Sequence, residues 1–126
     1  MATAEHPRRV VVLGASDNPE RYSNMAVRRL LDAGHDAIPV HPTLDRVHGI
    51  PVTASLGDIE AGVDTLSVYV SPAVSSKLAA AIVALAPGRV IFNPGAENPE
   101  LEADLEKLGI PTLHACTLVL LSTGQF

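Results

Sequence analysis

The stretch Arg9-Val10-Val11-Val12-Leu13-Gly14-Ala15-Ser16 decides the fold. Its apolar run is typical of a short buried strand, and Gly14 ends that strand. A polar loop follows over residues 15–23, and apolar residues at helical spacing then predict a helix from about Asn24 to Ala33. A strand, a glycine turn and a helix in this order form the first part of an α/β unit.

Strands and helices keep alternating along the rest of the chain. Further strands are predicted at Ala37–Val40, Ile50–Thr53, Val63–Val70, Arg89–Phe92 and Ile110–His114. One helix is predicted from a Ser71 cap to Pro87, and another from Asn98 to Gly109 with a buried stripe of Leu101, Leu105 and Leu108. Residues 43–49 are expected to form an open loop, and residues 117–122 fit either a short helix or an extension of the last strand.

This alternation predicts a single domain over residues 1–126, with a core of about 9–116, built as a doubly wound parallel sheet in three αβα layers. Right-handed crossovers favour a strand order in which residues 50–53 form one edge. The order then continues through 37–40, 9–13, 63–70, 89–92 and 110–114. The strand order reverses between residues 9–13 and 63–70, and ligands bind such sheets beside the carboxyl ends of the strands at this point.

The composition excludes several classes of protein. The chain has 126 residues, of which 47% are hydrophobic and 18% charged, which fits one folded domain. A formal net charge of −5 without a basic run speaks against nucleic acid as a partner. The chain has no signal-like apolar start, and no apolar run approaches the ~20 residues that span a bilayer, so no membrane association is expected. The one cysteine and five scattered histidines form no metal pattern, and a cytoplasmic protein is expected.

The loop after the first strand is the main chemical signal. The hydroxyl of Ser16, the helix amides behind it and the guanidinium of Arg21 are groups that bind phosphate. The loop departs from the dinucleotide fingerprint because Ser16 stands at the second glycine position and no third glycine follows. The second strand ends at His41, where an NAD site usually has an acidic residue for the ribose, and Asp36 lies at the other end of that strand. A glycine turn also occurs where nothing binds, so this loop alone does not decide the ligand.

Three further strand ends carry proline turns, namely His41-Pro42, Ser71-Pro72 and Asn93-Pro94-Gly95. Each comes directly after a predicted strand of the parallel sheet, so all three belong at the edge where residues 14–16 lie. Prolines fix the shape of a loop, although they also serve as ordinary punctuation between strands and helices. Four shaped loops on one edge favour a binding crevice.

These stretches together resemble the small stand-alone CoA-binding proteins, which are related to the N-terminal domain of the succinyl-CoA synthetase alpha subunit. The matching segments are Val11–Ser16, Arg21–Ser23, Ile38–Pro42, Gly49–Val52, Val63–Asp64, Ile91–Ala96 and Ala115–Val119. The resemblance implies a Rossmann-like fold that binds coenzyme A (CoA) or an acyl-CoA. The ligase reaction of the synthetase is not implied, because its phosphohistidine domain has no counterpart here.

The resemblance implies that the phosphates of CoA lie on residues 14–16 and that the other strand-end loops flank the nucleotide. Many family members carry Asn where this chain has His41. The predicted cofactor-binding residues are Gly14, Ala15, Ser16, Asp17, Arg21, Tyr22, Ser23, Val40, His41, Pro42, Ser71, Pro72, Asn93, Pro94 and Gly95. No catalytic and no metal-binding residue is predicted.

Alternatives stay open at this stage. The chain could be a nucleotide-dependent oxidoreductase fragment that uses NAD(P), or a regulatory subunit that docks a partner enzyme through its Leu118–Leu121 run. Cys116 could form a mixed disulfide with the thiol of CoA, or it could be a small core residue. Assembly as a homodimer or with a partner enzyme also stays open.

Overall fold

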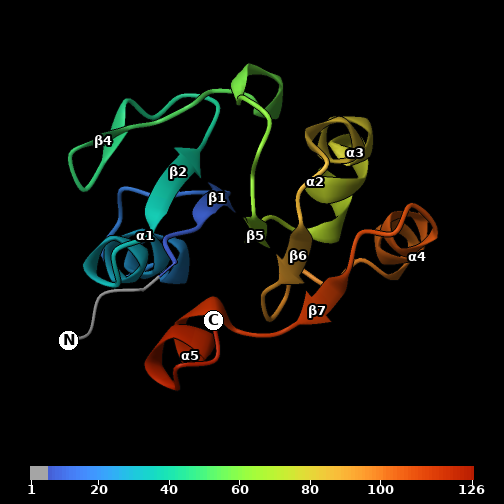
Figure 1. The fold of residues 1–126 in the computed structure, drawn as a ribbon. Helices are drawn as coiled ribbons and strands as arrows, with labels where there is room; N and C mark the ends of the chain where they lie inside the picture. The colour runs from blue at the N-terminus through green and yellow to red at the C-terminus, as the bar shows by residue number, and fades with distance from the viewer. Residues whose placement is uncertain (1–5) are drawn as a thin grey trace.

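The computed structural model describes residues 6–126 and contains a five-stranded parallel sheet at its centre (Figure 1). The strand order confirms the prediction for these five strands, and each neighbouring pair runs parallel. The strands across the sheet are β2 (Asp36–Val40), β1 (Arg9–Leu13), β5 (Thr65–Val68), β6 (Arg89–Phe92) and β7 (Thr112–His114). The order reverses between β1 and β5, where the two halves of the chain diverge to either side.

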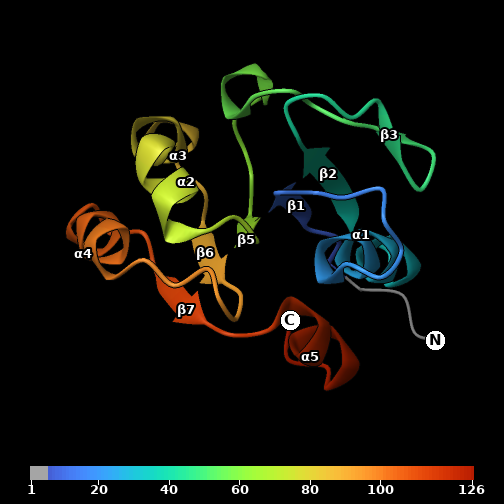
Figure 2. The ribbon, with the colours of Figure 1, turned by 180° about the vertical axis from the view of Figure 1, so that it is seen from behind.

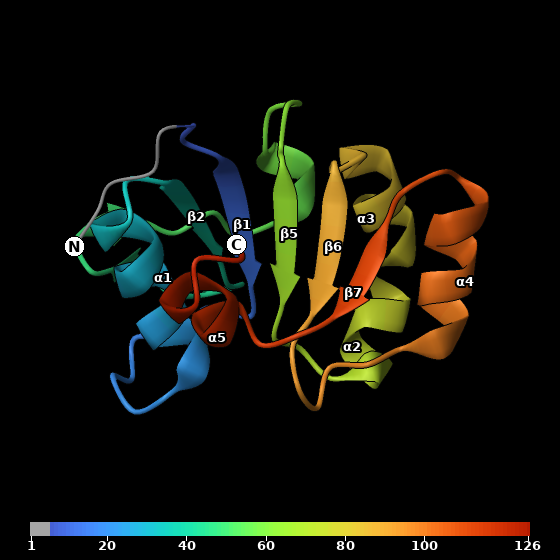
Figure 3. The ribbon, with the colours of Figure 1, turned by 60° about the horizontal axis from the view of Figure 1, so that its bottom comes forward.

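Helices cover both faces of the sheet, so the predicted three-layer Rossmann-like arrangement is confirmed. Figure 3 shows α1 (Tyr22–Asp32) and α5 (Thr117–Ser122) in front of one face, and Figure 2 shows the ribbon of Figure 1 from behind, with these two helices again on the same side of the sheet. The other face is covered by α2 (Pro72–Lys77), α3 (Ala79–Leu85) and α4 (Pro99–Lys107).

The alternation of side chains along β1 explains why this strand lies at the centre. Val10 and Val12 pack into the cluster under α1, whereas Val11 and Leu13 pack into the larger cluster under α3 and α4. Successive strand residues point to opposite faces, and a strand covered on both sides needs apolar residues at every position. The unbroken run of apolar residues at 10–13 is therefore the sequence signature of this central position.

The predicted sixth strand at Ile50–Thr53 is wrong. The chain instead forms a small hairpin, in which β3 (Arg46–Val47) lies in the expected open loop and β4 (Ile50–Pro51) takes the first two residues of the predicted strand. His48 and Gly49 both have positive φ, which is the geometry of a two-residue hairpin turn. Only Thr53 reaches the sheet, through a single parallel bridge to Val40.

The predicted helix between Ser71 and Pro87 is interrupted at Leu78. Ser71 caps α2 as expected, but Leu78 has a non-helical backbone (φ −98°, ψ 4°), so α2 ends before it and α3 begins after it. The hydroxyl of Ser75 donates to the carbonyl of Pro72, a contact that bends helices. The predicted burial of Leu108 is also wrong, because α4 ends at Lys107 and leaves Leu108 59% exposed.

Two further differences affect the residues around the crevice. Helix α1 begins at Tyr22 rather than Asn24, so the predicted loop residues Tyr22 and Ser23 form its first turn. Residues 117–122 form helix α5, which settles the choice between helix and strand. Within α5, Leu121 packs against the cluster under α1 while Val119 is 54% exposed, so the apolar run is divided between core and surface.

Among residues 6–126, none of the helices has the length and apolar content that crossing a bilayer requires.

Candidate functional site

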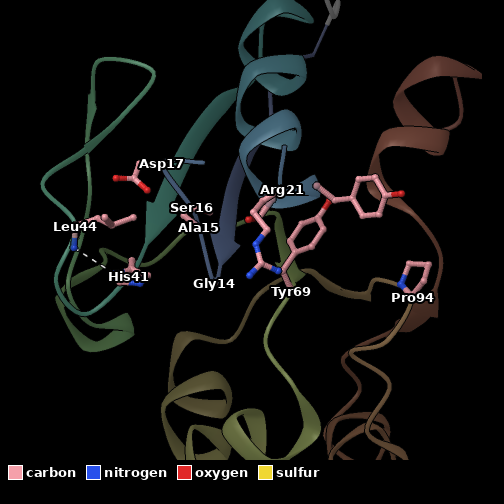
Figure 4. Close-up of a pocket in the computed structure, with 11 residues that line it drawn as sticks. Gly14, Ala15, Ser16, Asp17, Arg21, His41, Leu44, Tyr69 and Pro94 are labelled. Atoms are coloured by element: carbon pink, nitrogen blue, oxygen red, sulfur yellow. Dashed lines mark hydrogen bonds between the residues drawn. The ribbon is translucent and has the colours of Figure 1, made fainter. Parts of the chain in front are cut away.

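A hollow of about 450 Å³ opens at the carboxyl ends of β1, β2 and β5, where the strand order reverses. This is the position where ligands bind doubly wound sheets. Figure 4 shows residues from several elements converging on it. The lining residues are Gly14, Ala15, Ser16, Asp17, Arg21, Tyr22, Ser23, His41, Leu44, Tyr69 and Pro94.

The β1–α1 loop is held by its own hydrogen bonds. The amides of Gly14 and Ala15 both donate to the carbonyl of Val40, at 3.1 Å each, so neither is free for a phosphate. The hydroxyl of Ser16 accepts from the Asn18 amide at 3.0 Å, and the side-chain amide of Asn24 donates to the Ser16 carbonyl at 2.9 Å. These hydrogen bonds fix the shape of the loop, and they use the amides of both Gly14 and Ala15.

The segment that follows β5 leaves no room for a side chain at Gly14. Its φ is +88°, and a Cβ built there would lie 2.8 Å from Cγ1 of Val70 and 3.3 Å from the backbone nitrogen of Val70. No side chain fits at that distance without moving the β5 end. The glycine lets the β1–α1 loop lie close to the segment after β5, at the point where Gly14 lines the hollow.

The open N-terminus of α1 faces the hollow. Arg21 occupies the N-cap position, where Ser, Thr, Asp or Asn is usual, and its side chain makes no capping hydrogen bond. The amides of Tyr22 and Ser23 find no acceptor within residues 6–126, and the first turn contains no acidic residue. Unpartnered amides and the positive end of the helix dipole favour an anion here. The exposed guanidinium of Arg21 adds a positive charge at the same point.

His41 follows β2 and holds the next turn together. Its Nδ1 accepts from the amides of Thr43 at 3.1 Å and Leu44 at 3.2 Å, as the bond drawn in Figure 4 indicates for Leu44. An Asn or Asp side chain makes the same contacts in an Asx turn. The side chain of His41 therefore closes this turn as an Asx side chain would.

Tyr69 is a lining residue that the sequence analysis did not single out. It follows β5, and its ring packs against the cluster under α1. Its hydroxyl is buried and has no hydrogen-bond partner within the described residues, since the nearby hydroxyls of Ser67 and Thr117 bond to each other at 2.8 Å. Burial raises the pKa of Tyr69 to about 12, and those two hydroxyls offset only part of this effect. The apolar Val63–Val70 pattern gave no sign that its one aromatic residue would face a hollow.

A second hollow of about 380 Å³ adjoins the first and shares Gly14 and His41 with it. Its lining is mostly apolar and comes from β1, β2, the segment before β5, α2 and α3. The lining residues are Leu13, Gly14, Val40, His41, Pro42, Ala54, Ser55, Leu56, Val70, Val74, Leu78 and Ala81. A polar hollow and an apolar hollow thus meet at Gly14 and His41.

The structure brings most of the predicted cofactor-binding residues to these two hollows. Four of the predicted cofactor-binding residues line neither hollow, namely Ser71, Pro72, Asn93 and Gly95, and neither does Cys116, the possible redox thiol. Ser71 caps α2, and the side-chain amide of Asn93 is buried and bonded to β5 and to the start of α5. Cys116 is half-buried at the N-cap of α5, outside both linings.

A cationic cluster lies at the opposite edge of the sheet, around a hollow of about 260 Å³. The guanidinium carbons of Arg8 and Arg89 lie 5.8 Å and 4.6 Å from the ring centroid of Phe126, and Arg8 pairs with Asp64 at 3.1 Å. Burial lowers the pKa of His35, whose ring is 5.1 Å from that of Phe126, and Arg8 adds to this lowering. For Asp64, burial raises the pKa, but hydrogen bonds from Thr65 and Arg8 and the charge of Arg8 bring it below its ordinary value.

Comparison with known proteins identifies the family of this chain. The sequence matches the family model described as CoA binding domain over residues 8–122. The chain belongs to the CoA-binding domain family. The resemblance inferred from the sequence is thereby confirmed, and the matched range covers both hollows described above.

One curated relative is Uncharacterized protein YneT of Bacillus subtilis (strain 168), which is 37% identical over 65 residues. The match covers 52% of this chain and spans about half (48%) of that relative's length.

Several solved structures share the fold of this chain. One, described only as the crystal structure of an uncharacterized protein, has a TM-score of 0.92 at 38% identity and covers 97% of this chain and 100% of its own. A Thermus thermophilus protein has a TM-score of 0.86 at 31% identity, covering 95% of this chain and 91% of its own. A dinucleotide-forming acetyl-coenzyme A synthetase of Ca. Korarchaeum cryptofilum has a TM-score of 0.72 at 22% identity, covering 86% of this chain and 26% of its own. At that identity the synthetase shows the shared fold alone.

Proposed function

We propose that this chain binds coenzyme A or an acyl-CoA across the two adjoining hollows and performs no reaction of its own. The observation that carries this proposal is the uncapped N-terminus of α1, whose residues Arg21, Tyr22 and Ser23 line the polar hollow. Membership of the CoA-binding domain family supports the choice of ligand.

The chemistry of the two hollows fits the two ends of such a ligand. The free amides of Tyr22 and Ser23 and the charge of Arg21 suit phosphate groups, which a helix N-terminus stabilises. The apolar hollow, lined by residues such as Leu56, Val70 and Leu78, suits the uncharged parts of the same molecule. A CoA molecule carries both kinds of group along one chain.

Residues at the end of β2 favour CoA over NAD(P). An NAD-binding sheet of this type usually places a carboxylate after its second strand, to bond the ribose hydroxyls. Here that position is His41. Asp36 is the first residue of β2, so it lies at the amino ends of the strands, away from the hollows. The NAD(P)-dependent oxidoreductase fragment is the weaker alternative for this reason.

The absence of catalysis is part of the proposal. Nucleophilic catalysis needs a nucleophile beside an oriented base. Within the described lining, Nδ1 of His41 is occupied by two backbone amides, and the hydroxyl of Ser16 accepts from Asn18. The thiol of Cys116 lies outside both linings, and its mixed disulfide with CoA stays a prediction that a mass shift of the CoA-treated protein would test.

Calorimetry with CoA, NAD and NADP tests the proposed function. We expect CoA to bind and the two dinucleotides to give no comparable heat. The variant Arg21→Ala should weaken CoA binding by about tenfold or more, because a hydrogen bond to a charged group contributes about 1.5–3 kcal/mol. Arg28→Ala is the matched control, since Arg28 lies on the same helix, is exposed and pairs with Asp32. Binding of NAD without any response to CoA would overturn the proposal.

A homodimer or a complex with a partner enzyme stays a prediction. The apolar run Leu118–Leu121, which suggested a docking surface, contributes Leu121 to the core and exposes Val119. Light scattering at several protein concentrations, with and without CoA, would establish the state of assembly.

A further inference from the structure

The ring of His41 lies where the two hollows meet, and its two nitrogens are in different situations. Nδ1 accepts from the backbone amides of Thr43 and Leu44, which requires that this nitrogen carry no proton. In the neutral ring the proton is then on Nε2. Nε2 has no hydrogen-bond partner within residues 6–126. The bonds of the 41–44 turn to Nδ1 therefore leave Nε2–H of His41 as the N–H donor where the two hollows meet.

The junction is otherwise poor in donors. The amides of Gly14 and Ala15, which lie beneath it, are both bonded to the carbonyl of Val40. Gly14 itself has no side chain, and the remaining charged group of the polar hollow that favours anions, Arg21, belongs to the N-terminus of α1. Any ligand that occupies both hollows must pass Gly14 and His41, because these two residues line both.

We propose that Nε2–H of His41 donates to the diphosphate of the bound nucleotide and selects ligands that carry a diphosphate at this point. The proposal rests on the proposed function and deepens it. In CoA the diphosphate joins the nucleoside to the pantetheine arm, so it is the segment that crosses between a polar and an apolar compartment. A neutral N–H donor there replaces the backbone amides that the β1–α1 loop uses for its own bonds.

Two substitutions separate this role from a purely structural one. His41→Asn keeps an acceptor for the Thr43 and Leu44 amides, as in an Asx turn, and its N–H donors lie on Nδ2, which takes the place of the ring carbon Cδ2, so no donor is left at the position of Nε2. His41→Ala removes both. Calorimetry would compare wild type and both variants with CoA and with dephospho-CoA, which retains the diphosphate and lacks the 3′-phosphate.

We expect both variants to bind CoA and dephospho-CoA about tenfold more weakly than wild type, which corresponds to the loss of one hydrogen bond to a charged group. Full wild-type affinity in His41→Asn would overturn the proposal, because it would assign to His41 only the turn. A loss confined to CoA, with dephospho-CoA binding unchanged, would also overturn it, because the contact would then be to the 3′-phosphate. If wild type binds neither compound, the proposed function fails, and this inference fails with it.

Nitrogen-15 spectra of the histidine rings give a readout that does not depend on affinity. We expect His41 to be the Nε2–H tautomer in the free protein and its Nε2 resonance to move when CoA is added. An Nδ1–H tautomer, or an Nε2 signal that ignores a saturating ligand, would contradict the assignment. Amide hydrogen exchange at Thr43 and Leu44 checks that the turn persists in His41→Asn, so the comparison stands even if His41→Ala is poorly folded.

Discussion

At the scale of single residues, Gly14 shows how one position can be predicted correctly for an incomplete reason. The sequence marks it as the turn after the first strand, beside the loop that is predicted to bind phosphate. The structure adds a cause from the fold, because Val70 occupies the space that a side chain would need. Only the packing of two segments 56 positions apart in the chain reveals this, and no local pattern contains it.

Gly14→Ala should lower the free energy of unfolding by at least about 2 kcal/mol. The left-handed backbone costs an alanine about 1–2 kcal/mol, and forcing a methyl group into a packed site costs about 1–3 kcal/mol more. Gly109→Ala is the control, since Gly109 also has a positive φ but a Cβ there would have no neighbour within 4 Å. Chemical denaturation measures both. Equal losses in the two variants would mean that the contact with Val70 contributes nothing.

His35 predicts how stability responds to acid. Burial lowers its pKa below the ordinary value of 6.5, so the unfolded chain binds protons that the folded chain releases. The stability due to the neutral ring is complete above about pH 6.5 and is lost as the pH falls through the lowered folded value. Asp64, whose pKa is also lowered, acts in the same direction, but only near and below its ordinary value of 3.8.

We expect the melting temperature to fall between pH 7.5 and 5.5, and to fall less in His35→Asn. Asparagine does not titrate in this range and can still accept from the amide of Arg8, which Nδ1 of His35 does at 3.0 Å. Thermal unfolding at the two pH values measures the difference. An unchanged pH dependence in the variant would assign the effect to other groups.

At the scale of elements, the side chain of Asn93 joins three of them. Its Nδ2 donates to the hydroxyl of Ser67 and the carbonyl of Val68, both at 2.9 Å, and its Oδ1 accepts from the amide of Thr117 at 2.8 Å. The sequence suggested a ligand contact because Asn93 opens a proline turn after β6. In the structure its polar atoms form hydrogen bonds with β5 and α5 instead, and no pattern of residue spacing in the sequence predicts these contacts.

Asn93→Ala should therefore lower stability by about 1–3 kcal/mol, because it leaves buried groups on β5 and α5 without partners. Asn93→Asp keeps the acceptor for Thr117 but places a buried carboxylate oxygen against the carbonyl of Val68, so it should lose at least as much. The affinity of the folded protein for CoA should change little in Asn93→Asp. Denaturation and calorimetry on the same samples separate the two effects, and a large loss of affinity with unchanged stability would return Asn93 to the binding residues.

The elements that the sequence predicts well are those whose burial leaves a periodic pattern. The strands β1 and β6, which are buried at every position after their first residue, have the predicted bounds Arg9–Leu13 and Arg89–Phe92. The edge segment around residues 46–53 carries little apolar pattern, so its hairpin was taken for a loop and a strand. The start of α1 was misplaced by two residues because Arg21 is an unusual N-cap. That same unusual cap is what leaves the helix end open to a ligand.

At the scale of the whole molecule, the alternation of strands and helices was enough to predict the sheet order and hence the edge where the hollows lie. It did not predict two hollows, one polar and one apolar. Their linings include residues from four separate segments of the chain, namely Leu44 and Tyr69 in the first and Leu56 and Val74 in the second. A ligand that binds the folded chain alone stabilises it by about 2.7 kcal/mol at a hundredfold excess over its dissociation constant. We expect CoA to raise the melting temperature in this way and NAD to leave it unchanged.

The most direct test of CoA binding at the α1 end is an NMR titration of the nitrogen-15-labelled protein with CoA. We expect the largest amide shifts at Ser16, Tyr22 and Ser23, with smaller shifts for the residues that line the apolar hollow. Shifts confined to the opposite edge of the sheet, around His35 and Phe126, or no shifts at all, would contradict the proposed site.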